Sequence, residues 1–259
     1  MASEDTKRFN VLGVGISSID MGAALKVIDG WITRRESKYV TITGVHGVME
    51  SQGDEDIRKI HNQAGMVTPD GMPLVWLGRF NKHKNVNRVY GPDLMLEIFA
   101  QSAAKGYRHY LYGGNEGVPE LLKSKLDEKF PGINIVGTYS PPFRALSEEE
   151  DKKIVQMLNV AKPDIIWVGL STPKQEKWMA GHVDRLNVPA LIGVGAAFDF
   201  HSGLIKQAPP WMQKSGLEWL FRLLTEPRRL WRRYFRNNPR FVFLIVRQML
   251  GLKRYADDW

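Results

Sequence analysis

The sequence contains no cysteine among its 259 residues. This absence excludes a disulfide framework, a thiolate nucleophile and a zinc ribbon, and it favours a cytosolic enzyme over a small secreted scaffold. The chain also lacks an apolar run of the roughly 18 to 20 residues that a membrane-spanning helix needs, and it opens without a signal-peptide pattern. We therefore expect a soluble or peripheral protein of one large domain, or of one domain with an appendage.

Signatures of several common catalytic sites are missing as well. The six histidines show no metal-ligand spacing, and the sequence has neither a P-loop nor a GxSxG nucleophile elbow. Asp54-Glu-Asp56 has the form of a DxD metal motif, but it lies in a charged run with no apolar strand before it, so we interpret it as an exposed helix start. The sequence predicts no metal site and no cofactor.

The net charge of +8 is concentrated at one end of the chain. Residues 211–259 hold eleven basic and four acidic residues, a net charge of +7, together with ten aromatic residues. Such a composition suits nucleic acid or an anionic membrane surface, because both present phosphates. Residues 241–250 are mostly apolar and long enough to lie in a membrane interface, although a helix packed on the body is the alternative.

Short apolar runs alternate with amphipathic stretches before this tail, as in repeated β-α units. The runs are almost entirely apolar, which is typical of a parallel sheet covered on both faces. The sequence therefore predicts an α/β core over residues 1–210 and a helical, basic appendage over residues 211–259. The expected strands are 9–14, 39–43, 66–68, 108–112, 134–138, 164–170 and 190–194, and the expected helices include 21–34, 92–104, 118–129, 148–159, 212–224, 228–236 and 241–250.

Glycine-rich or polar residues follow four of these strands, where ligands bind in open α/β sheets. Gly113 and Gly114 precede a helix, and their bare amides suit a nucleotide diphosphate, although a tight turn also needs glycine. The spacing departs from GxGxxG, which argues against an NAD-type enzyme. At a second strand end, Gln175 can bind a base or a sugar hydroxyl and Glu176 can accept from a ribose; a helix start capped by Thr172 is the alternative.

Two further strand ends carry candidate site residues. Asp70 lies between Pro69 and Gly71 on a stiff turn, where a general base would be held in one place, although Asp before Gly is also common in turns. The other strand end supplies two hydroxyl groups and an imidazole, which are either polar contacts to a ligand or local structure. These three residues are Thr41, Thr43 and His46.

In their order along the chain, these motifs resemble the WecG/TagA/CpsF glycosyltransferases. The resemblance rests on Thr-Pro-Asp-Gly-Met-Pro (68–73), Arg-Val-Tyr-Gly-Pro-Asp (88–93), Tyr-Leu-Tyr-Gly-Gly (110–114), Gly-Leu-Ser-Thr-Pro-Lys-Gln-Glu (169–176), Gly-Val-Gly-Ala-Ala-Phe-Asp (193–199) and the tail motifs within 216–234. It implies a Rossmann-like core with a membrane-associating appendage. It also implies an inverting, metal-independent transfer of a sugar from a UDP-sugar to a polyprenyl-diphosphate-linked saccharide, by a peripheral enzyme on the cytoplasmic face of the cell membrane.

The resemblance assigns roles to individual residues. It makes Asp70 the base that deprotonates the acceptor hydroxyl, and it places Thr41 and Arg222 beside it as catalytic residues. Guanidinium groups of the tail are expected to meet diphosphate charge. The residues expected to bind substrate are Thr43, His46, Gly113, Gly114, Gln175, Glu176, Arg229 and Arg232.

One motif departs from the family pattern. Many members have Thr-x-Asn at the second strand, where this chain has Thr41-Ile-Thr43 followed by Gly-Val-His46. This variant is more similar to GumM-like exopolysaccharide members, which add glucose to a glucosyl lipid, and it implies that the donor carries glucose or another hexose. Nucleic-acid binding by the tail stays the alternative function, and a homo-oligomer is left open.

Overall fold

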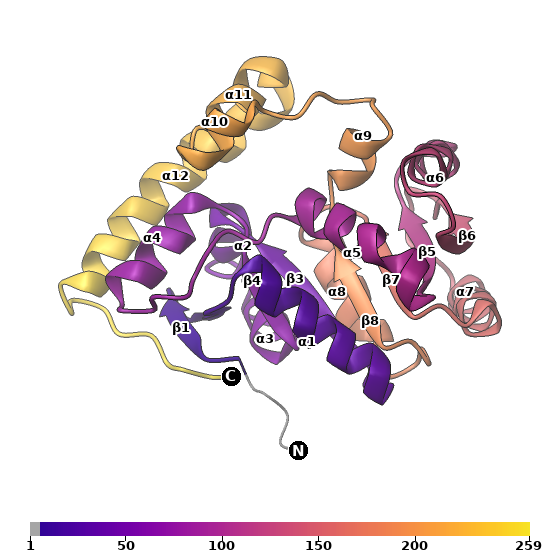
Figure 1. The fold of residues 1–259 in the computed structure, drawn as a ribbon. Coiled ribbons are helices and arrows are strands. Elements are labelled where there is room, and N and C mark those ends of the chain that lie inside the picture. Colours follow the sequence, from indigo (N-terminus) through magenta and orange to yellow (C-terminus); the bar gives the residue numbers. More distant parts are fainter. Residues whose placement is uncertain (1–5) are drawn as a thin grey trace. The chain divides into compact units, whose positions relative to one another are not determined.

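The computed structural model describes residues 6–259 (Figure 1). The main sheet consists of β3 (Lys38–Thr43), β4 (Met66–Pro69), β5 (Arg108–Gly113), β6 (Asn134–Tyr139), β7 (Ile165–Gly169) and β8 (Ala190–Gly193). The strand order is β4-β3-β8-β7-β5-β6, and β3 with β8, β8 with β7, β7 with β5, and β5 with β6 pair in parallel. The predicted α/β fold is confirmed.

The chain divides into two compact units. Unit 1 comprises the described residues up to Asp20 together with Thr43–Tyr90 and Lys206–Trp259, and unit 2 comprises Met21–Ile42 and Gly91–Ile205. The basic tail therefore shares a unit with two earlier segments of the chain. The predicted functional division at residue 210 stays a prediction.

Unit 2 encloses its part of the sheet between helices. Its helices are α1 (Met21–Arg34), α5 (Gly91–Lys105), α6 (Val118–Lys129), α7 (Glu148–Ala161), α8 (Lys174–His182) and α9 (Ala197–His201). On one face of the sheet Tyr112 stacks on Trp178 of α8, with ring centroids 4.3 Å apart. On the opposite face the ring of His109 lies 4.2 Å from that of Phe99 in α5. Alternate residues of β5 thus bind helices on opposite faces, as a doubly covered strand requires.

His109 is a buried polar residue in the core of unit 2. The indole Nε1 of Trp167 donates to His109 Nδ1 at 3.1 Å, and His109 Nε2 lies 2.8 Å from the hydroxyl of Ser102. Because Nδ1 must accept, the ring is neutral with its proton on Nε2. Burial lowers the pKa of His109 to about 3. The side chain is therefore satisfied by two hydrogen bonds only while it is uncharged.

Unit 1 begins with a hairpin and is otherwise largely helical. Its elements outside the main sheet are β1 (Arg8–Val11), β2 (Val14–Ser17), α2 (Val45–Glu50), α3 (Glu55–Gln63), α4 (Met72–Phe80), α10 (Pro210–Lys214), α11 (Glu218–Thr225) and α12 (Pro227–Met249). The expected single strand over 9–14 was wrong. Leu12 and Gly13 both have positive φ and reverse the chain, so that Val11 pairs with Val14 across a two-residue turn.

The tail also differs from expectation. The two expected helices 228–236 and 241–250 form one helix, α12, with Pro239 inside it. A proline in a helix interior costs about 3 kcal/mol, and the burial of Phe241 and Ile245 offsets this cost. The expected helix 212–224 is interrupted at Gly216, whose φ is +76°. The interpretation of Asp54 as a helix start is confirmed, since its carboxylate accepts from two backbone N–H groups of α3.

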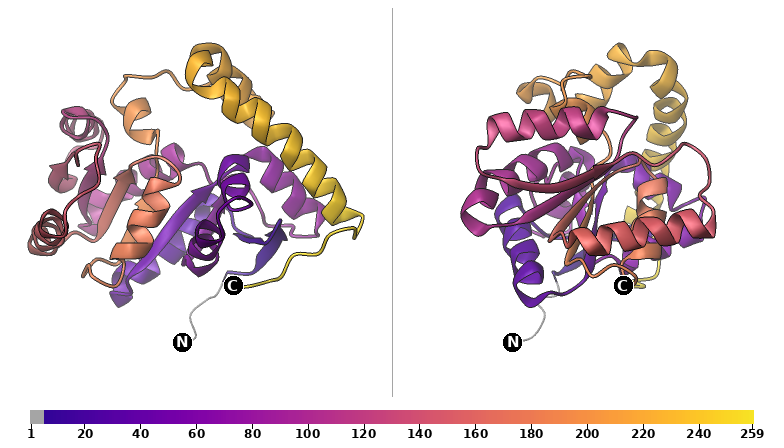
Figure 2. Two further views of the ribbon diagram at one scale, coloured as in Figure 1. Left: turned by 180° about the vertical axis from the view of Figure 1, so that it is seen from behind. Right: turned by 90° about the vertical axis from the view of Figure 1, so that its right-hand side faces the viewer.

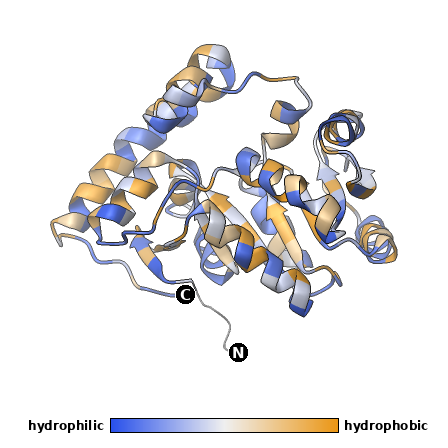
Figure 3. Cartoon of the chain, in the orientation of Figure 1, coloured by the Kyte–Doolittle hydropathy of each residue, from blue (hydrophilic) through white to orange (hydrophobic). Residues whose placement is uncertain are grey.

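The residues that follow α12 run back along the β1-β2 hairpin, as Figure 2 shows from two sides. The side-chain amide of Asn10 donates to the carbonyl of Tyr255 at 3.1 Å, and the backbone N–H of Leu12 donates to Gln248 Oε1 at 3.0 Å. Along α12 the residues change from hydrophilic to hydrophobic (Figure 3). In the part of the chain that the structure describes, no helix combines the length and the apolar character that crossing a membrane requires.

We predict that the protein loses stability as the pH falls from 6.5 to 5. The ordinary pKa of histidine is 6.5, whereas burial holds the pKa of His109 near 3 and that of His61 near 4. The unfolded chain therefore takes up more protons than the folded one in this window, which lowers the free energy of unfolding by up to about 1.4 kcal/mol per pH unit for each such histidine.

Urea unfolding at pH 7.5, 6 and 5 measures this effect. The variant His109→Gln keeps an acceptor for Trp167 and a donor for Ser102 but cannot titrate. Its free energy of unfolding should decrease less between pH 7.5 and pH 5 than that of the parent. Equal decreases would contradict the assignment of a neutral, buried imidazole.

Candidate functional site

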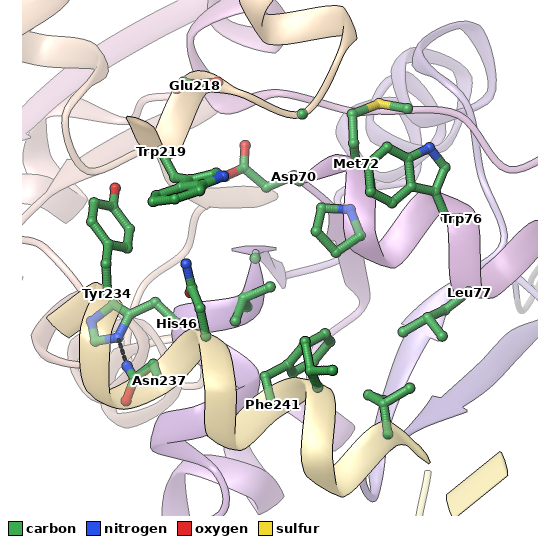
Figure 4. A pocket seen from close by; sticks show the side chains of 18 of the residues that line it. His46, Asp70, Met72, Trp76, Leu77, Glu218, Trp219, Tyr234, Asn237 and Phe241 are labelled. Atoms are coloured by element: carbon green, nitrogen blue, oxygen red, sulfur yellow. Dashed lines mark hydrogen bonds between the residues drawn. The ribbon is translucent and has the colours of Figure 1, made fainter. Parts of the chain in front are cut away.

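A cavity of about 700 Å³ lies within unit 1 and is lined by residues of α2, α4, α10, α11 and α12 and of the loops next to them (Figure 4). Its lining is divided into a polar and an apolar part. The polar side chains are His46, Asp70, Arg88, Gln213, Glu218, Arg222, Arg233, Tyr234, Asn237 and Asn238. The apolar ones are Val45, Met72, Pro73, Trp76, Leu77, Phe80, Trp219, Phe241, Val242, Ile245, Val246 and Met249.

Asp70 occupies the position directly after β4, as the sequence predicts. Its backbone N–H donates to the carbonyl of Thr43 at 3.0 Å, which fixes the turn against the end of β3. A Cβ atom on Gly44 would lie 3.6 Å from Asp70 Oδ2, so a glycine leaves space beside the carboxylate. The side chains of Asp70 and Trp219 both line the cavity (Figure 4). The carboxylate thus stands at the wall of a ligand-sized space on a fixed backbone, which a general base needs.

Arg88 connects this turn to the tail. Its Nε donates to the carbonyl of Asp70, and its Nη2 forms an ion pair with Glu218 at the start of α11. The guanidinium lies 4.0 Å above the ring centroid of Tyr90, whose hydroxyl donates to Glu218 Oε1 at 2.8 Å. Burial alone would lower the pKa of Arg88, but the carboxylates of Asp70 and Glu218 outweigh it and raise the pKa. Arg88 is therefore a permanent cation that holds α11 next to the loop of Asp70.

His46 lies on the cavity wall in the first turn of α2. Burial, with a smaller effect from the charge of Arg233, lowers the pKa of His46 to about 4. The ring is therefore neutral near pH 7, and its Nδ1 accepts from the side-chain amide of Asn237 at 3.3 Å rather than forming an ion pair with Glu50. This contact joins α2 to α12 and orients the imidazole (Figure 4).

The predicted arginines are not all at the cavity. Arg222 lines it, with its Nη2 3.5 Å from Glu226 Oε1. Arg229 forms an ion pair with Glu226 instead, and Arg232 lies over the ring of Trp231, and neither is part of the lining. Arg233 takes the lining position, and its buried Nε has no hydrogen-bond partner among the described residues.

Sequence reasoning therefore missed part of the polar wall. Arg88 and Glu218 lie inside motifs that support the family resemblance, but nothing local shows that they pair across 130 positions of the chain. Arg233 follows Arg222 by eleven residues, close to three helical turns, and that spacing was the available signal. From helical spacing alone, either Arg232 or Arg233 could share a helix face with the earlier tail arginines. The structure places only Arg233 in the lining.

The other predicted residues belong to unit 2 and form a second, smaller cluster at its strand ends. Thr41 in β3 is buried and pairs with Gly193 of β8. A Cβ on Gly193 would lie 3.0 Å from the side-chain nitrogen of Gln175. Gln175 is buried, and its Oε1 has no hydrogen-bond partner within residues 6–259. An unsatisfied buried acceptor of this kind is what a ligand donor would complete.

The segment around Glu176 is built differently from a simple helix cap. The Thr172 hydroxyl donates to Glu176 Oε1 at 2.9 Å, and the Gln175 amide donates to the same oxygen at 3.1 Å. Helix α8 starts after Pro173 without a side-chain cap, so the alternative of a cap by Thr172 is wrong. The carboxylate of Glu176 thus orients the side chains of Thr172 and Gln175.

Gly113 and Gly114 close the end of β5. Gly113 has φ +125°, and a Cβ there would lie 2.6 Å from the backbone of Gly169. The backbone N–H of Gly114 donates to the carbonyl of Gly169 at 2.9 Å. The close approach of β5 and β7 therefore requires glycine at position 113. This need for glycine in a tight turn is the alternative that the sequence left open. The anion-binding role of both glycines stays a prediction.

The comparisons identify the family. A family model described as "Glycosyl transferase WecG/TagA/CpsF family" matches residues 9–255. The chain belongs to this family. Two relatives share the name N-acetylglucosaminyldiphosphoundecaprenol N-acetyl-beta-D-mannosaminyltransferase. The protein from Bacillus subtilis (strain 168) is 29% identical over 78% of this chain and 76% of its own length, and that from Staphylococcus aureus (strain NCTC 8325) is 23% identical over 96% of each.

Membership in the WecG/TagA/CpsF family makes the chain a glycosyltransferase and confirms the resemblance found in the sequence. The predicted catalytic and binding residues divide between the two units. Asp70, Thr43, His46 and the tail arginines lie in unit 1, and Thr41, Gly113, Gly114, Gln175 and Glu176 lie in unit 2. Among residues 6–259, no three histidine, aspartate or glutamate side chains are grouped in a way that could hold a metal ion.

We predict that Arg88→Met loosens α11. Both members of the Arg88–Glu218 pair are largely buried, so removing one leaves an uncompensated charge, which costs local stability. Amide exchange over residues 218–225 should accelerate by about tenfold or more, measured by hydrogen exchange. Arg79→Met is the matched control, because Arg79 binds Asn87 and the carbonyl of Val86 and does not contact Glu218. Equal exchange of α11 in the two variants would contradict this role.

Proposed function

We propose that this glycosyltransferase transfers a hexose from a UDP-sugar to a saccharide linked to polyprenyl diphosphate, with inversion at the anomeric carbon. One observation mainly supports this proposal: a carboxylate, Asp70, and two guanidinium groups, Arg222 and Arg233, line the polar part of a cavity whose other part is apolar. A base, a site for phosphate charge and an apolar surface are what the acceptor of such a reaction needs. The relatives are named for a diphosphoundecaprenol substrate.

In the proposed reaction Asp70 acts as the general base. Its carboxylate accepts the proton of the acceptor hydroxyl while that oxygen forms a bond to the anomeric carbon of the donor. The bond between this carbon and the β-phosphate oxygen of UDP breaks, and UDP departs with the electron pair. Arg222 stabilises the charge that develops on the departing diphosphate, since a guanidinium matches phosphate oxygens in geometry and sign.

We assign binding of the donor to the unit 2 cluster. Gln175, with its unsatisfied carbonyl oxygen, is suited to a donor group of the sugar or base. Glu176 orients Gln175, and Thr41, which the resemblance makes a catalytic residue, lies buried at the neighbouring strand end. The backbone N–H groups near Gly113 and Gly114 are suited to the diphosphate. The more exposed Arg229 and Arg232 are assigned to phosphate charge near the tail.

The donor sugar is the least constrained part of the proposal. The relatives are named as N-acetylmannosaminyltransferases, whereas Thr41-Ile-Thr43 in this chain lacks the asparagine of many family members. We therefore propose glucose or another hexose. A screen of UDP-glucose, UDP-galactose, UDP-N-acetylglucosamine and UDP-N-acetylmannosamine against glucosyl and N-acetylglucosaminyl lipid diphosphates tests this choice directly.

We further propose that the enzyme works peripherally on the cytoplasmic face of the membrane, with an anionic lipid surface rather than nucleic acid as the partner of the tail. The basic residues of α12 and the exposed side chains of Phe243, Leu250 and Leu252 are suited to such a surface. Co-sedimentation with anionic vesicles, compared with gel shifts of RNA and DNA, tests this choice of partner.

We predict that Asp70→Asn lowers transfer by about 10²-fold or more while the fold and the binding of UDP stay nearly unchanged. The amide cannot accept the proton at neutral pH, but it preserves the size of the side chain. The rate is measured with a short-chain lipid acceptor and the affinity by calorimetry with UDP.

Asp56→Asn is the control for this experiment, because Asp56 is exposed at the start of α3. Its transfer rate should equal that of the parent. A variant at Asp70 with an unchanged kcat would remove the base from the mechanism.

We also predict that transfer survives chelation. In the proposed mechanism Arg222 and the other tail arginines offset the charge of the diphosphate, so that a divalent cation is not needed. Activity measured in EDTA should match activity in buffer. Loss of activity in EDTA that Mg²⁺ or Mn²⁺ restores would refute this assignment of charge stabilisation.

A further inference from the structure

Helix α4 has two apolar faces, and the second of them is only partly covered. Leu74, Val75 and Gly78 are buried on the first face. Pro73, Trp76, Leu77 and Phe80 recur at helical spacing on the second face and line the cavity. Trp76 is 51% exposed and Phe80 66% exposed. Large side chains at this exposure cost free energy unless an apolar ligand covers them.

Helix α12 faces this surface with a matching stripe. Phe241, Ile245 and Met249 follow one another at intervals of four residues, and Val242 and Val246 lie beside them in the lining. At a rise of about 1.5 Å per residue this apolar stripe is about 12 Å long. Phe241 of α12 and Leu77 of α4 both point into the space between the two helices (Figure 4). The two helices thus form an apolar groove within unit 1.

The groove continues into the polar part of the cavity. On α12 the lining residues before Phe241 are Arg233, Tyr234, Asn237 and Asn238. Arg88 is paired with Glu218 and Arg222 with Glu226, whereas the described residues show no ion pair for Arg233. Arg233 Nε is buried and has no partner within the described part of the chain. A ligand that fits this lining therefore carries an anionic head and an apolar tail.

We infer that the groove between α4 and α12 binds the first isoprene units of the acceptor's polyprenyl chain, with Arg233 binding its diphosphate. This inference rests on the proposed function for the identity of the acceptor. It gives the apolar half of α12 a role in substrate binding within the cavity, in addition to any contact with the membrane. In this arrangement the sugar attached to the diphosphate lies in the polar part of the cavity, whose lining includes Asp70.

The inference separates two sets of exposed apolar residues on the same helix. Val246 and Met249 belong to the groove, whereas Phe243 is 60% exposed and is not part of the lining. A surface that only contacts lipid bilayer would use both sets alike. A groove for one isoprenoid chain uses only the first set, and this difference is the basis of the test.

Binding is tested first without the transfer reaction. Farnesyl diphosphate serves as the probe, and inorganic pyrophosphate and a farnesyl alcohol are compared with it. The full chain should bind farnesyl diphosphate more tightly than either, with a blue shift of tryptophan emission that is lost in Trp76→Phe. Val246→Gln and Phe80→Gln should weaken binding by about tenfold or more, since each loses apolar contact area. Phe243→Gln, the matched control, should bind as the parent does.

Kinetics then test the same groove during turnover. The groove variants should raise KM for a polyprenyl-diphosphate acceptor by about tenfold, and they should lower kcat/KM by a smaller factor for an acceptor with a short alkyl chain. Arg233→Met should weaken binding of farnesyl diphosphate and of pyrophosphate alike. Circular dichroism and thermal unfolding of each variant confirm that the fold is intact.

The outcomes distinguish the inference from the proposed function. If the parent transfers sugar but Phe80→Gln and Val246→Gln bind farnesyl diphosphate as the parent does, the groove is not the isoprenoid site and the function stands. If farnesyl diphosphate binds as described but no lipid acceptor is glycosylated, the proposed function fails and the groove stands. Equal losses in the groove variants and in Phe243→Gln would assign the whole surface to bilayer contact and overturn the inference.

Discussion

The ion pair between Arg88 and Glu218 is the contact on which unit 1 depends. Through it the charge of one arginine holds the start of α11, while its Nε holds the carbonyl of Asp70. Because the pair is largely buried, its desolvation is compensated only when all three partners are in place. The wall of the cavity and the position of the carboxylate are therefore fixed together, and a displacement of α11 would disturb both.

Much of unit 2 could be predicted from the sequence. Its strands are short, almost wholly apolar runs, and α1, α5, α6 and α7 have an apolar stripe at helical spacing, so that local pattern and final fold agree. Unit 1 was harder because its signals are not local. Helix α4 is apolar on two faces and shows no amphipathic period, and the continuity of α12 across Pro239 depends on the burial of Phe241 and Ile245.

The site shows the same contrast. Asp70 was predicted because it follows a strand directly, and Gln175 because it lies in the polar segment after another strand; both positions are visible in the sequence. Arg88, Glu218 and Arg233 were missed because their place at the cavity depends on contacts between segments far apart in the chain. Charge counts alone placed the arginines in the tail but did not select Arg233 over Arg232, since one residue shifts a helical side chain by about 100°.

Unit 1 is assembled from three separate stretches of the chain, and this has a consequence for biosynthesis. Residues 91–205 leave the ribosome before Lys206–Trp259, so most of unit 2 is available to fold while the cavity of unit 1 still lacks α11 and α12. The cavity-lining face of α4 then lacks α11 and α12 opposite it. A nascent chain at this stage exposes Trp76 and Phe80 to other apolar surfaces. The cavity of unit 1 is therefore completed as one of the last events of synthesis, when the arginine-rich helix α12 emerges.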